Sequence, residues 1–574
     1  MEKKSGKRKL KIGRIMVALL IVVMLILGIS YLLNGKGISI IYQAKYLGST
    51  ASNVDLYDEE FNKVFSLARG SKVKVNDKKE ITNEDNTYLL VKYDNKEYYV
   101  LKENIVNDKK DAVMEKELYV RTAATILGDL DGKIAGLAEK GTLLKIKGYD
   151  SYDDKGIVNA YLVTNESGEE GYVYSKYLVS NKEESLLNYD ADTYDPIHSK
   201  IKNTYGGGDA INLDYYPVTK ANFENNKMPE SVYALYLNNG TDVINNIDKY
   251  IEFAKDTLIN TFVVDIKDNT TPGYKSEVMK ELSPTNYKHG INDYDKYKTA
   301  IKKLKDAGFY VVGRITVFKD SFYVEDHPED AMISPSTGKP YKYSKSYWPN
   351  PFDRDVWYFN IELAKEAVKE MGFNEINFDY VRFTDRTQSL ERKNTIKFEN
   401  IYNEDKAQAI QRFLQYACDE IHKLNAYVSV DVFGESTNGN YLTAYGQYWP
   451  AISNVVDVIS AMPYPDHFAN NSYGISKPWN HPYELMTAWG KEASKRQEET
   501  TTPAIARTWV QAYDVMKYVD SNGISYGSKE VQAEIQGLFE QGLDGGYITW
   551  LASSNLAKYK VQKEAFKIDY RSKY

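Results

Sequence analysis

The sequence predicts a multidomain protein with an N-terminal transmembrane helix, two small all-β barrels and a C-terminal (β/α)8 TIM barrel. Three observations lead to this fold class. A long uncharged run follows a basic N-terminus, two segments alternate apolar and polar residues, and eight strand-like segments follow, most of them separated by helical periodicity. Barrel enzymes of this kind carry their chemistry at the C-terminal ends of the strands, so the strand ends are the candidate site.

The N-terminus predicts a membrane anchor. Residues 1–14 are rich in Lys and Arg, and residues 15–33 carry no charge. Nineteen helical residues span about 28 Å, close to the hydrocarbon thickness of a bilayer. The basic flank predicts a single-pass cell-membrane protein with a cytoplasmic N-terminus and extracellular C-terminal domains. A cleaved signal peptide is the alternative, although the run is long for one and no small-residue cleavage pattern follows it.

Composition narrows the class of partner. The net charge of −7 and a pI near 5.7 argue against a nucleic-acid partner, which usually requires a basic surface. The single cysteine, Cys418, excludes an intramolecular disulfide and zinc sites built on cysteines. Fifty tyrosines suit contacts with carbohydrate, since a ring stacks on a sugar and its hydroxyl hydrogen-bonds, but a β-rich composition explains them equally well. No dinucleotide or Walker motif is present, and no cofactor is expected.

The chain divides into segments by pattern. Residues 46–108 and 112–181 each show an opening strand, a glycine turn before an alternating strand, and two tyrosine-containing strands joined by a polar turn. Residues 182–228 are predicted to be a linker, locally flexible at the three glycines 206–208. The barrel is expected over 229–570.

Strands and helices of the barrel alternate along the sequence. The predicted strands are 231–237, 261–267, 309–317, 375–382, 427–433, 456–462, 503–510 and 546–551. The predicted helices are 242–257, 293–308, 355–372, 405–425, 482–500 and 528–542. Between the fifth and sixth strands we expect a long loop with a short helix.

The fourth and fifth strands end in carboxylates. Asp379 lies near the end of the fourth strand, with Arg382 beyond it to favour the ionised form. Asp431 lies in the fifth strand, and Glu435 shares its face if the strand continues. A two-carboxylate glycosidase needs one ionised and one protonated carboxyl group. Asp379 is therefore predicted to be the nucleophile or charge stabiliser and Glu435 the acid/base, with Asp431 as the alternative acid. The structural alternatives are a loop-ordering Asp–Arg pair and a buried hydrogen-bonding Asp431.

Other strand ends supply predicted substrate contacts. These are Asp265, Arg314, Arg382, Tyr464, His467, Arg507, Trp509 and Trp550. Asp265, Asp379, Asp431 and Asp466 with His467 offer a rival metal site, suited to a polysaccharide deacetylase. Because the chain lacks closely spaced histidine pairs, no metal is expected.

Short motifs resemble known families. At VVDIKD, INFDYVRF and VSVDVFG the chain resembles the bacterial glycosyl-hydrolase-like barrel family, over about residues 230–555. This resemblance implies a TIM barrel with glycosidase activity and a catalytic Asp379, and carboxylates on strands four and five would be similar to the α-amylase arrangement. LYVRTAAT and GYVYSKYLV in the second β segment resemble bacterial SH3-like domains, with Tyr172 in place of the usual Trp, and the first β segment is more diverged. Such domains bind peptidoglycan or peptide, or serve as spacers.

Together these features predict a membrane-anchored extracellular glycoside hydrolase acting on a cell-wall or surface polysaccharide. The expected partners are polysaccharide or peptidoglycan and, through the N-terminal helix, the membrane. The alternatives are a non-catalytic polysaccharide-binding scaffold and the metal-dependent deacetylase. The sequence predicts neither the sugar, its linkage, nor the oligomeric state.

Overall fold

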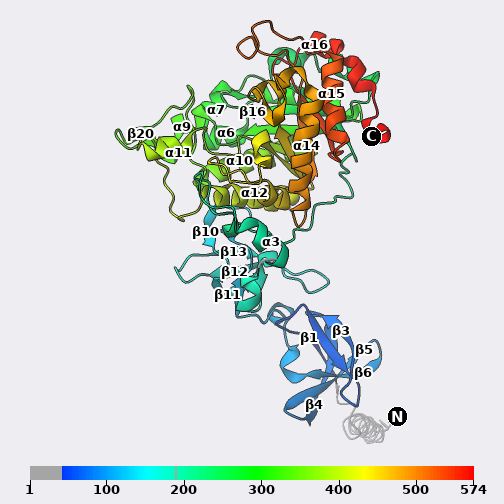
Figure 1. Ribbon diagram of the computed structural model, residues 1–574. Coiled ribbons are helices and arrows are strands. Elements are labelled where there is room, and N and C mark those ends of the chain that lie inside the picture. The colour runs from blue at the N-terminus through cyan, green and yellow to red at the C-terminus, as the bar shows by residue number, and fades with distance from the viewer. Residues whose placement is uncertain (1–41, 188–190) are drawn as a thin grey trace, which may run out of the picture. The chain divides into compact units, whose positions relative to one another are not determined.

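The computed structural model describes residues 42–187 and 191–574. The chain forms two compact units (Figure 1). One contains the described residues up to 118 with 143–166 and 172–176. The other contains 119–142, 167–171 and 177–574, including the whole barrel.

The N-terminal region contains two sheets of seven strands. The first has the order β3-β2-β6-β5-β4-β1-β7. Its strands are β1 Gln43–Leu47, β2 Asn53–Tyr57, β3 Lys63–Ala68, β4 Lys72–Asn83, β5 Asn86–Tyr93, β6 Lys96–Leu101 and β7 Ile105–Val106. Alternating side chains such as Val54, Leu56, Val73 and Val75 are buried in its core, as the period-two pattern requires.

The second sheet has the order β10-β9-β13-β12-β11-β8-β14. Its strands are β8 Glu117–Val120, β9 Ala124–Leu127, β10 Ile134–Ala138, β11 Leu143–Tyr149, β12 Ala160–Thr164, β13 Glu170–Tyr174 and β14 Leu178–Val179. The all-β character of this region agrees with the sequence pattern. The SH3-like assignment of the two segments is not confirmed.

The predicted membrane anchor needs correction. Residues 1–14 and 15–33 lie outside the described residues. Among residues 42–187 and 191–574, no helix is both long enough and apolar enough to cross a bilayer. The longest described helices, α12 Lys406–His422 and α14 Pro482–Glu498, have 17 residues each and carry charged side chains. The predictions of a membrane-spanning fold and of a single-pass localisation in the cell membrane are therefore wrong for the chain as the structure describes it.

Part of the segment predicted to be a linker packs on the barrel. It contains α2 Lys182–Leu186 and α3 Ala191–His198. Beyond them Ile201, Leu213 and Tyr215 are buried with Leu442 and Tyr448 of the barrel domain. The apolar residues dispersed in this segment thus anchor it along the barrel.

The barrel contains eight parallel strand positions. The strands are β15 Val232–Leu237, β16 Thr261–Asp268, β18 Tyr310–Thr316, β21 Glu375–Asp379, β22 Tyr427–Phe433, β23 Val458–Met462, β24 Ile505–Ala506 with β25 Thr508–Gln511, and β26 Gly546–Trp550. Their order is β24-β23-β22-β21-β18-β16-β15-β26-β25. The seventh strand is split at Arg507, so β24 pairs with β23 and β25 pairs with β26. The chain through Arg507 joins the two ends of this order, which makes the barrel nearly closed.

Helices cover the outside of the barrel (Figure 1). The longer ones are α5 Ile247–Lys255, α8 Tyr294–Asp306, α10 Arg354–Glu366, α12 Lys406–His422, α14 Pro482–Glu498 and α15 Ser528–Phe539. The shorter ones are α4 Thr241–Asn245, α6 Glu277–Leu282, α7 Pro284–His289, α9 Ser321–Asp326, α11 Thr387–Arg392, α13 Trp449–Val455, α16 Leu556–Val561 and α17 Tyr570–Lys573. Three short strands, β17 Thr271–Pro272, β19 Ile333–Ser334 and β20 Lys339–Pro340, lie in loops. The short α13 between strands five and six fits the expected loop with a short helix.

Two features of the barrel interior position the site. Its lower part is filled by Val232, Tyr310 and Val312, against which Phe223 and Met228 of the preceding segment pack. The upper part is polar. There the fourth strand ends at Asp379, because Tyr380 adopts a left-handed conformation with φ of 53°. A non-glycine residue in this conformation is uncommon and often marks a functional position.

Candidate active site

A buried arginine stands among carboxylates at the C-terminal ends of strands two to five. Arg314 of β18 is 2% exposed. Its Nη1 is 2.7 Å from Asp265 Oδ1 and 3.5 Å from Asp268 Oδ1, and its Nη2 forms an ion pair with Asp379. Its Nε is 3.9 Å from Asp431 Oδ2. A buried cation requires such partners, because leaving it unpaired away from water is costly. Arg314 of the third strand therefore organises the acidic groups of three neighbouring strands, the second, fourth and fifth.

Asp431 of β22 accepts hydrogen bonds on one of its two carboxyl oxygens. Its Oδ1 accepts hydrogen bonds from Asn377 Nδ2 at 2.9 Å and Trp509 Nε1 at 2.7 Å. Burial, together with the charge of Asp379, raises the pKa of Asp431 well above its usual range, although Arg314, Asn377 and Trp509 act in the opposite direction. Within the described residues Asp431 Oδ2 and Arg314 Nε are buried without a hydrogen-bond partner. A ligand in the cavity can still satisfy these two atoms, as it can Asn269 Oδ1 in the cavity wall.

Asp265 of β16 supports the arginine from below. It is 1% exposed and accepts a hydrogen bond from Tyr236 of β15. Burial raises the pKa of Asp265 to about 6. Asp265 does not line the cavity above Arg314, so its place is that of a group that positions Arg314.

The cavity itself has a volume of about 220 Å³. Eight of the predicted site residues line it, and they are Asp379, Asp431, Arg314, Arg382, Tyr464, His467, Trp509 and Trp550. Trp509 and Trp550 meet edge to face with ring centroids 5.6 Å apart. Aromatic walls beside carboxylates suit a sugar ring, which offers an apolar face and hydroxyl groups.

The arginine that pairs with Asp379 differs from the expected one. Arg314 takes this role, whereas Arg382 lies 3.3 Å from Asp385 and over the Phe433 ring at 4.3 Å. Arg382 still lines the cavity. Because the strand breaks at Tyr380, Arg382 no longer follows the alternation of strand four.

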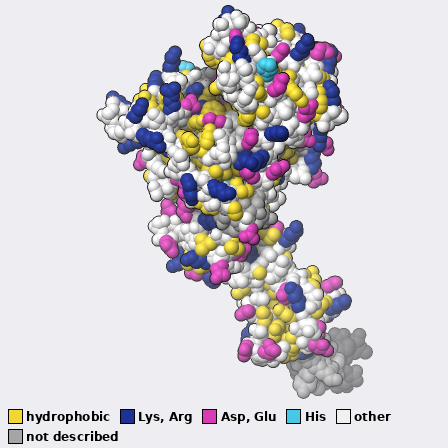
Figure 2. Space-filling model, in the orientation of Figure 1, with side chains coloured by type: hydrophobic (Ala, Val, Ile, Leu, Met, Phe, Trp, Pro, Cys, Tyr) yellow, Lys and Arg dark blue, Asp and Glu magenta, His cyan; other side chains and the backbone are white. Residues whose placement is uncertain are grey.

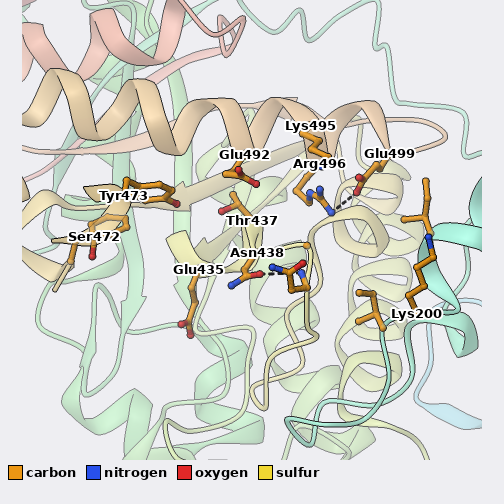
Figure 3. Close-up of a pocket in the computed structure, with 15 residues that line it drawn as sticks. Lys200, Glu435, Thr437, Asn438, Ser472, Tyr473, Glu492, Lys495, Arg496 and Glu499 are labelled. Carbon is orange, nitrogen blue, oxygen red and sulfur yellow. Dashed lines mark hydrogen bonds and ion pairs between the residues drawn. The ribbon is translucent and has the colours of Figure 1, made fainter. Parts of the chain in front are cut away.

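Glu435 lies in a different depression. The chain turns into a short 3-10 helix at Gly434–Thr437 immediately after β22, so Glu435 leaves the face of Asp431. It is exposed and lines an open groove of about 870 Å³ with Asn438, Tyr473 and Arg496 (Figure 3). In Figure 3 the Glu435 side chain points away from the Glu492, Arg496 and Glu499 side chains of α14. Partial burial and the charge of Asp385 raise the pKa of Glu435. The structure thus brings Asp431, and not Glu435, together with Asp379.

Arg507 also lies away from the cavity. It is fully buried, and its Nη1 is 2.7 Å from Glu375 Oε1 at the start of strand four. Tyr310 donates a hydrogen bond to the other oxygen of Glu375 at 3.1 Å. This ion pair closes the lower part of the barrel, opposite the strand ends that carry the cavity.

Several cavity and support residues were not predicted. They are Tyr236, Asn269, Asn377, Tyr380 and Phe433. Asn377 had a readable signal, since it lies two residues before Asp379 and shares its face of strand four. Phe433 stands in the same relation to Asp431.

The carboxylates proposed as metal ligands surround a guanidinium instead. Asp265, Asp379 and Asp431 all lie around Arg314, while Asp466 accepts a hydrogen bond from Tyr513 at 2.7 Å. In the described part of the chain no group of three or more His, Cys, Asp or Glu side chains is arranged to hold a metal ion. The residue pattern behind the deacetylase alternative does not assemble there into a ligand set.

Comparison with known proteins gives a family match. A sequence model of the family described as "Putative glycosyl hydrolase domain" matches residues 234–556, more than half of the chain. This range contains all eight strand positions except the first two residues of β15. No curated protein matches the chain.

Solved structures resemble parts of the chain. A hypothetical protein from Ruminiclostridium thermocellum is 32% identical, covers 34% of this chain and 97% of its own, and has a TM-score of 0.29. The glycoside hydrolase domain of PgaB (BpsB) from Bordetella bronchiseptica is 13% identical. The match covers 60% of this chain and 100% of that domain, with a TM-score of 0.42. The catalytic domain of a β-amylase from Paenibacillus polymyxa is 10% identical. The match covers 60% of this chain and 99% of that domain, with a TM-score of 0.38. At these TM-scores the likenesses carry no argument about function, which rests on the family match and the site.

Proposed function

Because the chain belongs to this family of glycosyl hydrolase domains, we propose that its barrel hydrolyses a glycosidic bond in a cell-wall or surface polysaccharide. One observation carries the proposal. Asp379 and Asp431 come from adjacent strands, line the same aromatic-walled cavity and face the same arginine. Two-carboxylate hydrolysis uses a pair of carboxyl groups that flank the scissile bond, which a shared cavity allows.

The two carboxyl groups differ in environment. Asp379 forms an ion pair with Arg314 and supplies negative charge to the anomeric carbon, as nucleophile or stabiliser. Asp431, whose pKa is raised by burial and by Asp379, holds the proton that the leaving oxygen requires. Asp431 thereby replaces Glu435 as the proposed acid.

The test is the release of new reducing ends from purified polysaccharides. We expect the full chain to release them and Glu435→Gln to retain most of the activity. Asp431→Asn should lose about 10²- to 10⁴-fold, the usual contribution of a general acid. Equal activity of Asp431→Asn and the native chain would overturn the assignment of Asp431. Loss in Glu435→Gln alone would return the acid role to Glu435.

A binding protein without catalysis is the second candidate. It is favoured by the size of the cavity, about 220 Å³, which is below the usual range of about 300–1,000 Å³ for ligand pockets. It is also favoured by Arg314, whose positive charge already offsets part of the negative charge of Asp265 and Asp379. Retention of a polysaccharide by the full chain with no reducing ends released, in any fraction, would support this candidate.

The pH dependence of the reaction tests the proton on Asp431. Asn377 donates a hydrogen bond to Asp431, which favours the charged carboxylate and lowers its pKa. Asn377→Leu removes this donor, so the pKa of Asp431 rises and the protonated acid persists to higher pH. We expect the alkaline fall of kcat/KM to move up by about 0.5–1 pH unit.

The matched control is Ser429→Ala. Ser429 Oγ is 3.2 Å from Asn377 Nδ2 and makes no hydrogen bond with Asp431 among the described contacts. The alkaline limb of the kcat/KM profile of Ser429→Ala should coincide with that of the native chain. An unmoved limb in Asn377→Leu would show that another group holds the catalytic proton.

A further inference from the structure

Two loops above the barrel form one small lobe. We define the basic lobe as residues 331–348, which follow strand three, and 384–398, which follow strand four. Its loops are joined by backbone hydrogen bonds between Ile333 and Lys397, at 3.1 and 2.9 Å. Met332, Trp348 and Ile396 form its buried core, against which Tyr341, Tyr343, Tyr380, Leu390 and Phe398 pack. The lobe is therefore a packed part of the barrel domain.

The lobe is strongly positive on an acidic protein. Its cations are all exposed, and they are Lys339, Lys342, Lys345, Arg386, Arg392, Lys393 and Lys397. Its only acidic residues, Asp385 and Glu391, lie near Arg382 at 3.3 Å and Lys406 at 2.9 Å. In the described part of the chain none of the seven cations forms an ion pair with a carboxylate. Figure 2 shows Lys and Arg side chains gathered where Figure 1 labels β20 and α11.

The tip of the lobe presents a lysine on a strained turn. Tyr343 and Ser346 exchange two backbone hydrogen bonds, of 2.9 and 3.1 Å. Between them Ser344 and Lys345 have φ of 51° and 67°, a pattern of two positive values that normally selects Asn and Gly. A non-glycine residue at such a position costs backbone energy that the rest of the fold must offset, and strain of this kind clusters at functional positions.

The core of the lobe contacts the wall of the cavity. Trp348 of the lobe core lies 5.9 Å from Tyr380, centroid to centroid, and the Arg382 guanidinium lies 5.1 Å from the Trp348 ring. Tyr380 and Arg382 both line the cavity. A polymer that leaves the cavity past strands three and four therefore meets the lysines and arginines.

We propose that the basic lobe binds negatively charged substituents of the substrate, so that the substrate is a polysaccharide with repeated carboxylate or phosphate groups. The inference rests on the proposed glycosidase function only in that it calls the bound polymer the substrate. The binding itself depends only on the positive charge of the lobe. Several cations on one rigid surface raise the local concentration of a polyanion and hold it by interactions that salt screens.

Binding by the full chain tests the proposal separately from hydrolysis. The probes are fluorescently labelled polygalacturonate, poly(glycerol phosphate) and neutral dextran of similar length. We expect one of the two anionic polymers to bind at least about tenfold more tightly than dextran, with affinity falling as NaCl rises from about 0.05 to about 0.5 M. The anionic polymer that binds identifies the charged group as carboxylate or phosphate.

A charge-removal variant locates the binding. In Lys339→Gln/Lys342→Gln/Lys345→Gln the Kd for the anionic polymer should rise roughly three- to tenfold, and its salt dependence should weaken. The control Lys249→Gln/Lys369→Gln/Lys529→Gln removes the same charge from exposed positions on or next to the outer helices α5, α10 and α15. It should change Kd less than about twofold. Melting temperatures of both variants show that the fold is kept.

Three results would overturn the proposal. They are equal binding of dextran and both polyanions, equal losses in the lobe and control variants, and equal or tighter binding of a single-stranded oligonucleotide of the same length. If the lobe variant loses polyanion binding while no polymer is hydrolysed, the basic lobe stands and the glycosidase function fails. If a neutral polymer is hydrolysed equally by both variants, the glycosidase function stands and the lobe proposal fails.

Discussion

Asp379→Asn is expected to lower kcat on the polysaccharide substrate by at least about 10³-fold, which corresponds to about 4 kcal/mol of transition-state stabilisation. The amide keeps the shape of the side chain but removes its charge. It can neither attack the anomeric carbon nor stabilise the positive charge that develops there. Because Arg314 keeps Asp265 and Asp268 as partners, the change should leave the barrel folded.

The control for this variant is Asp268→Asn. Asp268 also lines the cavity and lies 3.5 Å from Arg314, so the substitution removes the same charge from the same cluster. We expect a loss in kcat smaller than about tenfold, since one screened charge at this distance contributes about 1 kcal/mol. Equal losses in the two variants would mean that the net charge of the cavity matters, and that Asp379 has no special role.

A small anion separates chemistry from folding. Asp379→Gly leaves a space beside Arg314 that azide or formate can enter. If Asp379 provides the negative charge, millimolar azide should restore part of the activity of this variant and none of the activity lost in Asp431→Asn. Product release by both variants, measured with and without azide, shows whether the missing charge of Asp379 accounts for the lost activity.

The barrel could be predicted from the sequence because its strands are continuous apolar runs that alternate with amphipathic helices. Where the backbone departs from regular geometry, pattern reasoning failed. Strand four was expected to reach residue 382, but the positive φ of Tyr380 ends it at Asp379. Strand seven is split at Arg507, whose side chain turns to Glu375 inside the barrel.

Irregular backbone geometry also explains which residues of the candidate site could be predicted and which could not. Asp379, Asp431 and the aromatic walls follow from the rule that strand ends carry the chemistry. Glu435 was favoured by extending the period-two alternation one step past the end of β22, where the chain already turns into a 3-10 helix. The pairing of Arg314 with Asp265 and Asp379 joins three strands, and such long-range contacts leave no local pattern in the sequence. The basic lobe, by contrast, is visible in the sequence as lysines among tyrosines, but its place beside the cavity is not.

Arg314→Leu should destabilise the protein by about 3–5 kcal/mol at neutral pH, the usual cost of removing one partner from a buried ion pair. The substitution leaves Asp265 and Asp431 buried, and Asp379 nearly so, without the cation that compensates them. Urea unfolding at pH 7 measures the loss. Arg507→Leu is the control, because Arg507 is equally buried but pairs with the single carboxylate of Glu375 and lies away from the cavity.

The destabilisation should depend on pH in a defined direction. Burial already raises the pKa of Asp265 to about 6, and loss of Arg314 raises this pKa further. A carboxyl group with a raised folded-state pKa binds more protons in the folded state, so its cost is present above that pKa and disappears as the pH falls below it. The gap between Arg314→Leu and the native chain should therefore shrink from pH 7 to about pH 5. Adding Asp265→Asn to Arg314→Leu should shrink it at pH 7 as well. A gap that is the same at both pH values, with or without Asp265→Asn, would show that Arg314 contributes packing alone and does not hold the carboxylates of the site in place.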